Sequence, residues 1–254
     1  MNTFKSYAKV NIFLKIADKR EGYHELISRF VRVHNLFDCM SFVKTNKKAF
    51  DIIGNFGCKL ESNTVYKAYN LLKNYNGVEE FFNIYSVKVE KNIPEFAGLG
   101  GGSSNAATFL IMVNKYCELN LSKDDLCKIA VQVGADVPFF IYEYDSANVT
   151  GIGEIVEKFD EDILDIETIT PNIQCDTGEI FRIFREKFYK QIQKDEAKRL
   201  LSMNSLDILN EFNIYDANDL YEPAITSKPE LKAFAKKNWY FSGSGSSFFK
   251  VNNG

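Results

Sequence analysis

The sequence predicts an α+β fold, on the basis of three patterns in its 254 residues. Apolar residues alternate near the start of the chain, which is the period of a half-buried strand. Helical spacing with capping residues follows from residue 63 onward. A strand-turn-strand pattern lies at 239–251. The chain thus begins as a mostly antiparallel sheet and continues with helices, which is the order of an α+β protein.

The composition is that of an ordinary folded protein and excludes several function classes. The chain is 45% hydrophobic and 26% charged, with a net charge of -3. An acidic balance gives no general attraction to nucleic acid or to an anionic membrane, so a phosphate site must be local. No apolar stretch approaches the ~20 residues of a membrane helix. Five cysteines without a C-x-x-C pair are expected to be reduced thiols, and we expect a cytoplasmic protein without a structural zinc site.

The predicted strands come first. Residues 8–16 alternate strictly, and the face opposite the apolar one carries Lys9 and Asn11. These two side chains lie on one face with their Cα atoms about 6.8 Å apart, so one ligand could touch both. The alternative is a solvent-facing pair on an amphipathic strand. Further strand candidates are 30–33, 37–43, 50–53, a segment containing Val87 and Val89, and the apolar run 139–142.

The predicted helices begin at side chains that can cap them. Asn63 precedes a helix with apolar residues at 65, 68, 69 and 72, which we expect to end at Asn76-Gly77. Another helix opens at Ser103, and one opens at Ser122, with Asp125 in the capping-box position and Gly134 at its end.

A domain boundary is expected near residue 150, which divides the chain into 1–150 and 151–254. The second part contains a strand over 163–169 and a helix capped by Asp176, with Glu179 three residues later. Amphipathic helices are expected to fill 179–237.

A glycine cluster is the most informative segment. Gly98-Leu99-Gly100-Gly101-Gly102 follows a probable strand and precedes the helix at Ser103. Without side chains the backbone can turn its N–H groups toward a ligand, and the helix N-terminus adds a positive dipole end, which together suit a polyphosphate. The pattern is neither a Walker A motif nor a Rossmann fingerprint. A flexible loop or a tight packing site is the alternative.

From Pro94 to Ala107 the chain resembles the second motif of the GHMP kinase superfamily. Within it, further segments are similar to the members that phosphorylate a cytidine-diphosphate-linked methylerythritol: Ala8-Lys9-Val10-Asn11-Ile12-Phe13-Leu14, Gly22-Tyr23-His24 and Gly134-Ala135-Asp136-Val137-Pro138-Phe139-Phe140. The family's third motif is matched by Ser242-Gly243-Ser244-Gly245. One departure is Glu95-Phe96-Ala97, where the family has further glycines.

The resemblance implies a ribosomal-protein-S5-like N-terminal domain, a ferredoxin-like C-terminal domain and transfer of the γ-phosphoryl group of ATP. The acceptor would be the 2-hydroxyl of the cytidylyl erythritol, in the non-mevalonate route to isoprenoids. The resemblance implies that Lys9 and Asp136 are the catalytic pair and that Asn11 orients the erythritol part of the substrate. From the sequence alone, the place of Asp136 between a helix end and Pro138 favours a turn or capping residue over a functional carboxylate.

The same resemblance distributes the nucleotide contacts. It assigns cytosine to Tyr23, His24 and Phe181, with Thr177 beside them. ATP would contact Asn63, Lys91, Pro94, Gly98, Leu99, Gly100, Gly101, Gly102, Ser103, Ser104 and Asn105. Mg²⁺ is implied, and the hydroxyl of Ser104 is a candidate ligand, although no full ligand set is assigned. Lys91 reads equally as a solvated lysine at a strand end.

Two other functions stay open at this point. One is a related kinase with another alcohol acceptor, such as homoserine, mevalonate or a sugar, because the glycine loop does not name the substrate. The other is a nucleotide-binding regulator without turnover. Neither nucleic acid nor a membrane is an expected partner, and the oligomeric state is not fixed by the sequence.

Overall fold

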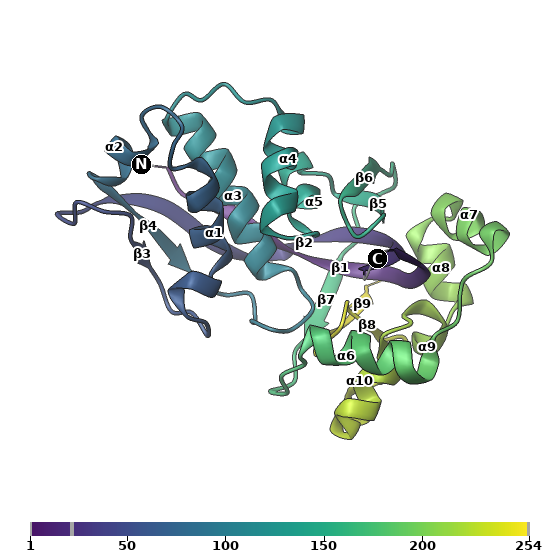
Figure 1. The fold of residues 1–254 in the computed structure, drawn as a ribbon. Coiled ribbons are helices and arrows are strands. Elements are labelled where there is room, and N and C mark those ends of the chain that lie inside the picture. Colours follow the sequence, from purple (N-terminus) through teal and green to yellow (C-terminus); the bar gives the residue numbers. More distant parts are fainter. Residues whose placement is uncertain (1, 21–22, 253–254) are drawn as a thin grey trace. The chain divides into compact units, whose positions relative to one another are not determined.

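The computed structural model describes residues 2–20 and 23–252, without the side chains of 18–20, 23 and 24 (Figure 1). The chain forms two compact units, each built from several segments. Among the described residues, unit 1 comprises 2–8, 36–93 and 101–143, and unit 2 comprises 9–20, 23–35, 94–100 and 144–252. These compact units are not the two sequence domains predicted to meet near residue 150, and that boundary stays a prediction.

Unit 1 consists of helices packed against a sheet with both antiparallel and parallel strand pairs. Strand β2 runs antiparallel to β4 from Cys39 opposite Glu90 to Lys44 opposite Tyr85, and β4 runs parallel to β3. The strands are β1 (Phe4–Arg20) and β2 (Tyr23–Lys44), which both continue into unit 2, β3 (Ile52–Ile53) and β4 (Tyr85–Glu90). The helical elements are η1 (Leu60–Ser62), α1 (Thr64–Leu72), α2 (Val78–Phe82), α3 (Gly101–Tyr116), α4 (Lys123–Val133) and α5 (Val137–Tyr142).

Aromatic rings fill much of the core of unit 1. The ring of Phe50 stacks on Tyr69 of α1 at a centroid distance of 3.8 Å and meets Phe82 edge-on at 4.9 Å. Phe82 in turn stacks against Phe109 of α3 at 5.7 Å. Rings in these geometries add to the free energy already gained by burying their area. They fix α1, α2 and α3 against one another.

Unit 2 contains one antiparallel extension of β2 and a separate three-stranded sheet. Residues 28–31 of β2 pair antiparallel with β5, which pairs with β6, while β9 lies between β7 and β8. The strands are β5 (Ser146–Thr150), β6 (Ile155–Lys158), β7 (Ile166–Ile169), β8 (Tyr240–Phe241) and β9 (Phe248–Val251). The helical elements are α6 (Thr177–Ile183), the π-helix η2 (Phe184–Phe188), α7 (Lys194–Ser202), α8 (Ser205–Glu211), α9 (Ile214–Ala217), α10 (Tyr221–Ser227) and the 3-10 helix η3 (Pro229–Phe234).

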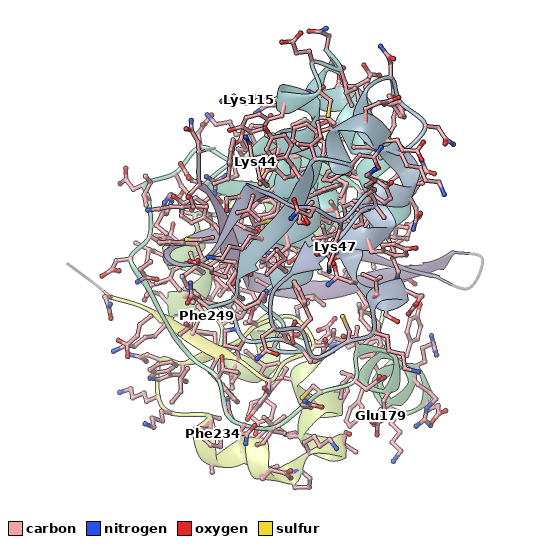
Figure 2. The ribbon with its side chains drawn as sticks, turned by 90° about the vertical axis from the view of Figure 1, so that its left-hand side faces the viewer. Lys44, Lys47, Lys115, Glu179, Phe234 and Phe249 are labelled. Atoms are coloured by element: carbon pink, nitrogen blue, oxygen red, sulfur yellow. The ribbon has the colours of Figure 1, made fainter. Side chains whose placement is uncertain are left out.

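Helices of unit 2 are tied to its sheet and to each other by identifiable contacts. The ring of Phe249, on β9, is fully buried, and Phe234 at the end of η3 stacks on Phe248 at 6.4 Å (Figure 2). The hydroxyl of Ser227 donates to the carboxylate of Glu179 at 3.0 Å, which joins α10 to α6. The three-stranded sheet therefore carries a helical layer of its own.

A buried arginine braces the other part of unit 2. Arg29 of β2 donates to the side-chain oxygen of Asn148 at 2.7 Å and to the carbonyls of Leu201 and Met203, and Glu161 lies 3.7 Å from its guanidinium. Burial lowers the pKa of Arg29 to about 10, and the charge of Glu161 opposes this shift. Arg29 thus stays charged at neutral pH and links β2 and β5 to the end of α7.

The α+β prediction is confirmed, and so are the helix-end signals at Asn63, Ser122, Gly134 and Asp176, whereas the helix predicted to open at Ser103 begins at Gly101. The side chains of Asn63, Ser122 and Asp176 each accept a backbone N–H at the start of α1, α4 and α6. Gly134 lies at the C-terminal cap of α4. None of the helices in the described ranges combines the length and apolarity that crossing a bilayer requires.

Three element predictions are wrong. The run 139–142 is helical in α5, because Pro138 fits the first turn of a helix and a short apolar run does not distinguish a buried strand from a buried helix. Helix α1 ends at Leu72, and Gly77 precedes α2 instead. The segments 30–33 and 37–43 are parts of one long strand, β2.

Candidate functional site

The first part of the glycine cluster is packed against the second glycine-rich segment of unit 2. Gly98 and Gly100 have φ angles of +74° and +70°, which glycine adopts without strain. A Cβ on Gly98 would lie 2.1 Å from the carbonyl oxygen of Ser242, and the hydroxyl of Ser242 donates to the carbonyl of Gly98 at 3.0 Å. The N–H of Ser247 donates to the carbonyl of Ala97 at 3.0 Å. Packing and backbone geometry therefore explain part of the glycine crowding.

The entry to this loop has a backbone conformation that favours glycine. Phe96 has a φ of +54°, in the left-handed region that favours glycine, and its ring is 53% exposed. The next residue, Ala97, is buried. The bulky side chain of Phe96 is therefore directed to solvent, and the loop adopts its course at the cost of backbone strain at one residue.

Lys9 and Asn11 form a buried pair in unit 2. Their exposed fractions are 3% and 2%, so the alternative of a solvent-facing pair is wrong. The Lys9 ammonium donates to the side-chain oxygen of Asn11 at 2.7 Å and lies 4.3 Å from the centre of the Phe30 ring. The amide of Asn11 donates to the hydroxyl of Ser28 at 2.9 Å. These contacts hold the ammonium in one place on β1.

Several predicted residues of unit 2 converge around this pair. The main-chain N–H of Lys9 donates to the carbonyl of Leu99 at 3.0 Å, which fixes the glycine loop beside β1. A Cβ on Gly243 would stand 3.5 Å from the side-chain oxygen of Asn11. The hydroxyls of Thr177 and Ser244 are 2.8 Å apart. The start of α6, the serine-glycine segment, the glycine loop and the β1 pair thus form one polar region.

The predicted cytosine contacts are described only in part. Phe181 is half-buried on α6, one turn after Thr177. Tyr23 and His24 begin β2, but their side chains lie outside the described residues. An aromatic sandwich around a base stays a prediction.

The second part of the glycine cluster opens α3 in unit 1. A Cβ on Gly101 would lie 2.9 Å from a side-chain carbon of Ile93, so packing requires glycine there. A Cβ on Gly102 would meet only Thr64, at an ordinary 3.5 Å. Gly102 is exposed, and internal packing therefore gives no reason for a glycine at this position. The first-turn N–H groups of α3 together with a bare backbone suit an anion.

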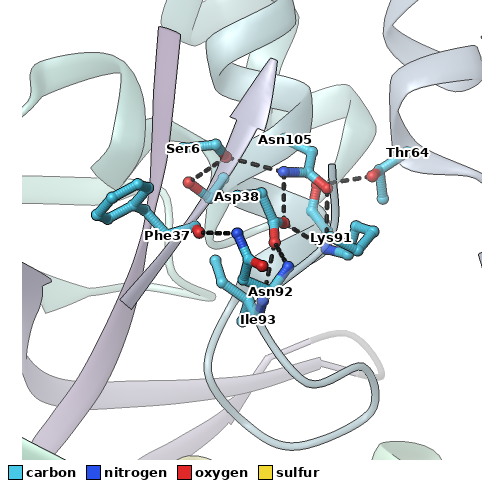
Figure 3. Close-up of polar contacts among 10 residues, drawn as sticks. Ser6, Phe37, Asp38, Thr64, Lys91, Asn92, Ile93 and Asn105 are labelled. Carbon is cyan, nitrogen blue, oxygen red and sulfur yellow. Dashed lines mark hydrogen bonds and ion pairs between the residues drawn. The ribbon is translucent and has the colours of Figure 1, made fainter. Parts of the chain in front are cut away.

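Lys91 is held by a network that the sequence did not reveal. Its side chain is 12% exposed and forms an ion pair with Asp38, and its ammonium donates to the side-chain oxygen of Asn105 at 3.1 Å (Figure 3). The alternative of a solvated strand-end lysine is wrong. The only signal for Asp38 was a single acidic residue inside an apolar strand.

The other residues predicted to contact ATP are buried or half-buried. Asn63 is buried and caps α1 by accepting the N–H of Val65 at 2.9 Å. The hydroxyl of Ser104 is buried and accepts from Ser6 at 2.8 Å, while Ser103 is half-buried. Pro94 is half-buried as well, in unit 2.

Asp136 is the residue just before α5. It is half-buried, and its carboxylate makes no capping hydrogen bond to the described residues of that helix. The interpretation of Asp136 as a helix-capping side chain is therefore wrong, although a carboxylate at a helix N-terminus is still favoured by the helix dipole. Asp136 belongs to unit 1 and Lys9 to unit 2, and their approach stays a prediction.

The described residues offer no ready-made metal cage. Within 2–20 and 23–252 no group of three or more His, Cys, Asp or Glu side chains is placed to hold a metal ion. Mg²⁺ usually keeps several waters and binds through substrate phosphates plus one or two protein groups.

Comparison with known proteins gives consistent matches. Residues 63–144 match the family described as "GHMP kinases N terminal domain". The chain is 52% identical to a 4-diphosphocytidyl-2-C-methyl-D-erythritol kinase of Sulfurimonas denitrificans, over 99% of this chain and 97% of that protein. It is 43% identical to the kinase of the same name from a Sulfurovum species, over 99% of each.

Solved structures agree with these matches. A crystal structure of 4-(cytidine 5'-diphospho)-2C-methyl-D-erythritol kinase has a TM-score of 0.74 and 28% identity, and the match covers 100% of this chain and 91% of the other. A mevalonate kinase has a TM-score of 0.66 at 15% identity, covering 100% and 92%, and shows the fold alone.

Proposed function

The chain belongs to the family of 4-diphosphocytidyl-2-C-methyl-D-erythritol kinases, within the GHMP kinases, and we propose on that basis that it phosphorylates the 2-hydroxyl of 4-diphosphocytidyl-2-C-methyl-D-erythritol. It is a small-molecule kinase that uses ATP. The observation that supports this substrate assignment is the 52% identity to the Sulfurimonas denitrificans kinase along nearly the whole of both chains. The reaction is a step of non-mevalonate isoprenoid synthesis, which we place in the cytoplasm.

The nucleotide would use both parts of the glycine cluster. We expect the phosphates of ATP at residues 94–104, where the bare backbone of Gly102 and the first turn of α3 favour anions. The adenosine part would lie toward Asn63 and Lys91. Support comes from the held position of the Lys91 ammonium and from the exposure of Gly102. Mg²⁺ would arrive on the phosphates and offset their charge, with Ser104 as a possible ligand.

The acceptor would be held in unit 2. The Lys9 ammonium, fixed by Asn11, donates to the 2-hydroxyl, and Asn11 orients the erythritol. The hydroxyl oxygen attacks the γ-phosphorus, the bond to the β-phosphate oxygen breaks and ADP leaves. The hydroxyl proton passes to the carboxylate of Asp136. Positioning and charge neutralisation supply most of the rate enhancement in such transfers.

The cytidine would be recognised by aromatic stacking. Tyr23 and His24 would contact one side of the cytosine, and Phe181 the other, with Thr177 near its edge. Stacking needs no basic surface, which agrees with the net charge of -3. The expected partner is therefore a small molecule with a cytidine diphosphate group.

A coupled assay of ADP release tests the function. Mg-ATP is supplied with the cytidylyl erythritol, homoserine, mevalonate or a sugar, and only the first should give turnover. Tyr23→Ala and Phe181→Ala should raise the KM of the cytidylyl substrate far more than that of ATP, whereas Tyr75→Ala, at an exposed tyrosine of unit 1, should change neither. Turnover of another acceptor would overturn the substrate assignment.

Asp136→Ala separates an enzyme from a regulator that only binds nucleotide. It should abolish ADP release while leaving nucleotide binding, measured by calorimetry, nearly intact. If ADP release persists, Asp136 is not the proton acceptor. A wild-type protein that binds ATP without turnover of any acceptor would be the regulator.

A further inference from the structure

Asp38 is the centre of a buried polar network in unit 1 (Figure 3). Its side chain has no exposed surface. One carboxylate oxygen accepts the main-chain N–H groups of Asn92 and Ile93 at 2.7 and 2.8 Å. The other accepts the amide of Asn105 at 2.9 Å and pairs with the ammonium of Lys91. One side chain on β2 thereby holds the segment that follows β4 and the second turn of α3.

The amide of Asn105 has a single possible orientation in this network. Its nitrogen donates both to Asp38 and to the hydroxyl of Ser6, at 2.9 Å each, and its oxygen accepts from Lys91. An amide nitrogen has two N–H donors, and both are used here. The side chain of Asn105 therefore has no donor left for a phosphate oxygen.

The ammonium of Lys91 does have a donor left. It carries three N–H groups, and among the described residues two acceptors contact it, Asp38 and Asn105. The ammonium nitrogen lies 3.4 Å from the Cβ position of Gly101, at the beginning of α3. Its third N–H is thus available beside the start of α3, where the proposed function places the nucleotide.

We propose that Asp38 is a positioning residue for the phosphoryl donor: it holds the Lys91 ammonium, directly and through Asn105, so that one N–H faces the nucleotide at the start of α3. The identity of the nucleotide rests on the proposed function. A lysine this buried needs a counter-charge, because an unpaired ammonium would be costly to keep out of water. Asp38 supplies that charge and leaves one donor for the ligand.

Asp38→Asn tests the proposal. The variant keeps the size of the side chain, removes its charge and turns N–H groups toward donors. The KM of Mg-ATP should rise at least tenfold, with kcat at saturating ATP reduced less than threefold and the KM of the acceptor within twofold. Loss of ground-state binding has this signature. A lower kcat with both KM values unchanged would reduce Asp38 to a structural brace.

A double-mutant cycle shows whether Asp38 acts through Lys91. In a Lys91→Met background, Asp38→Asn should change the KM of Mg-ATP less than twofold, because the group that it positions is gone. Effects that multiply in full would overturn the proposal. Glu90→Gln is the matched control, since it removes an acidic side chain next to Lys91 in the sequence whose ion pair, within the described part of the chain, is with Lys88.

A milder variant covers the case in which Asp38→Asn does not fold. Ser6→Ala removes one partner of the Asn105 amide and leaves the ion pair in place, and it should weaken ADP binding two- to fivefold by calorimetry. Unchanged binding would count against the network. ADP binds without the acceptor substrate, so its affinity tests the positioning role separately from the proposed function. Asp38 variants with weaker ADP binding support the positioning role even if the protein does not phosphorylate the cytidylyl substrate. If these variants phosphorylate the cytidylyl substrate and bind ATP with unaltered affinity, the proposed function stands and the positioning role of Asp38 is overturned.

Discussion

The carbonyl oxygen of Ser242 lies 2.1 Å from the point where a Cβ on Gly98 would stand, so two glycine-rich segments far apart in the sequence meet backbone to backbone. The Ser242 hydroxyl also donates a hydrogen bond to the carbonyl of Gly98, which holds the two segments together. Neither segment can move toward the other. The course of the glycine loop is therefore set by unit 2 itself.

Gly98→Ala should be strongly destabilising. The new Cβ clashes with main chain and sits on a residue with a φ of +74°, so we expect a loss of about 3 kcal/mol or more in urea unfolding. Gly77→Ala is the control, because Gly77 has a φ of +77° with nothing within 4 Å of its Cβ position. It should lose about 1 kcal/mol from backbone strain alone. Equal losses would mean that the contact with Ser242 yields easily.

Gly102→Ala should damage nucleotide binding without damaging the fold. The Cβ has space within the protein, and alanine suits a helix better than glycine, so the free energy of unfolding should stay level or rise by about 0.5–1 kcal/mol. The KM of Mg-ATP should rise at least tenfold, since the methyl group occupies the approach of a phosphate. Gly101→Ala should instead be destabilised by contact with Ile93. An unaltered KM in Gly102→Ala would place the phosphates elsewhere.

Lys9→Met should remove most of the turnover and little of the stability. Methionine fills the space over the Phe30 ring but cannot donate to the substrate hydroxyl, so kcat should fall about 10²-fold or more. Replacing a buried charge with an apolar side chain should change the free energy of unfolding by less than about 2 kcal/mol. Lys5→Met is the control, because Lys5 is also on β1 and its ammonium lies 4.3 Å from the ring of Phe37 on β2. This variant should leave kcat unchanged. A Lys9→Met variant with near-normal kcat would exclude the ammonium from the reaction.

Phe96 offers a test of the left-handed backbone at the loop entry. Phe96→Ala removes an exposed ring but keeps the strain, whereas Phe96→Gly also relieves it. The glycine variant should be the more stable of the two by about 1 kcal/mol in urea unfolding, after allowance for the greater freedom of glycine in the unfolded chain. An alanine variant that is the more stable would contradict the positive φ.

The thiol of Cys175 makes stability depend on pH in the alkaline range. Burial raises its pKa from 9.0 to about 11. The folded state favours the neutral thiol, so this contribution is complete below pH 9 and is lost as the pH rises through 11. The shift corresponds to about 2–3 kcal/mol. Urea unfolding in reducing buffer at pH 8 and 11 should show a smaller loss for Cys175→Ala than for the wild type; identical losses would exclude this thiol.

Local chemistry decided which parts of the structure could be predicted. The caps at Asn63, Ser122 and Asp176 involve only residues two or three positions away, and all three form. The phosphate-binding interpretation of the glycine cluster also rests on local residue types, and it stays a prediction. Helix α5 was missed because the six apolar residues carry no periodicity that distinguishes helix from strand.

Burial of polar side chains could not be predicted, because it depends on distant residues. Lys9 and Asn11 look like the wet face of a strand until Phe30, Ser28 and Gly243 are brought against them. Asp38 is buried only because Lys91 and Asn105, more than fifty residues later, supply its partners. Alternation along a strand indicates which residues share a face but not what will cover it.

The junction of Gly98 with Ser242 also bears on the order of events during synthesis. A ribosome must release the roughly 145 residues that separate residue 98 from residues 242–247 before the two segments can meet. Until then the nascent chain lacks the surface that shapes this turn, and a fragment cut near residue 150 would lack it permanently. We therefore expect nucleotide binding only after residues 242–247 have been synthesised and have packed against residues 97 and 98.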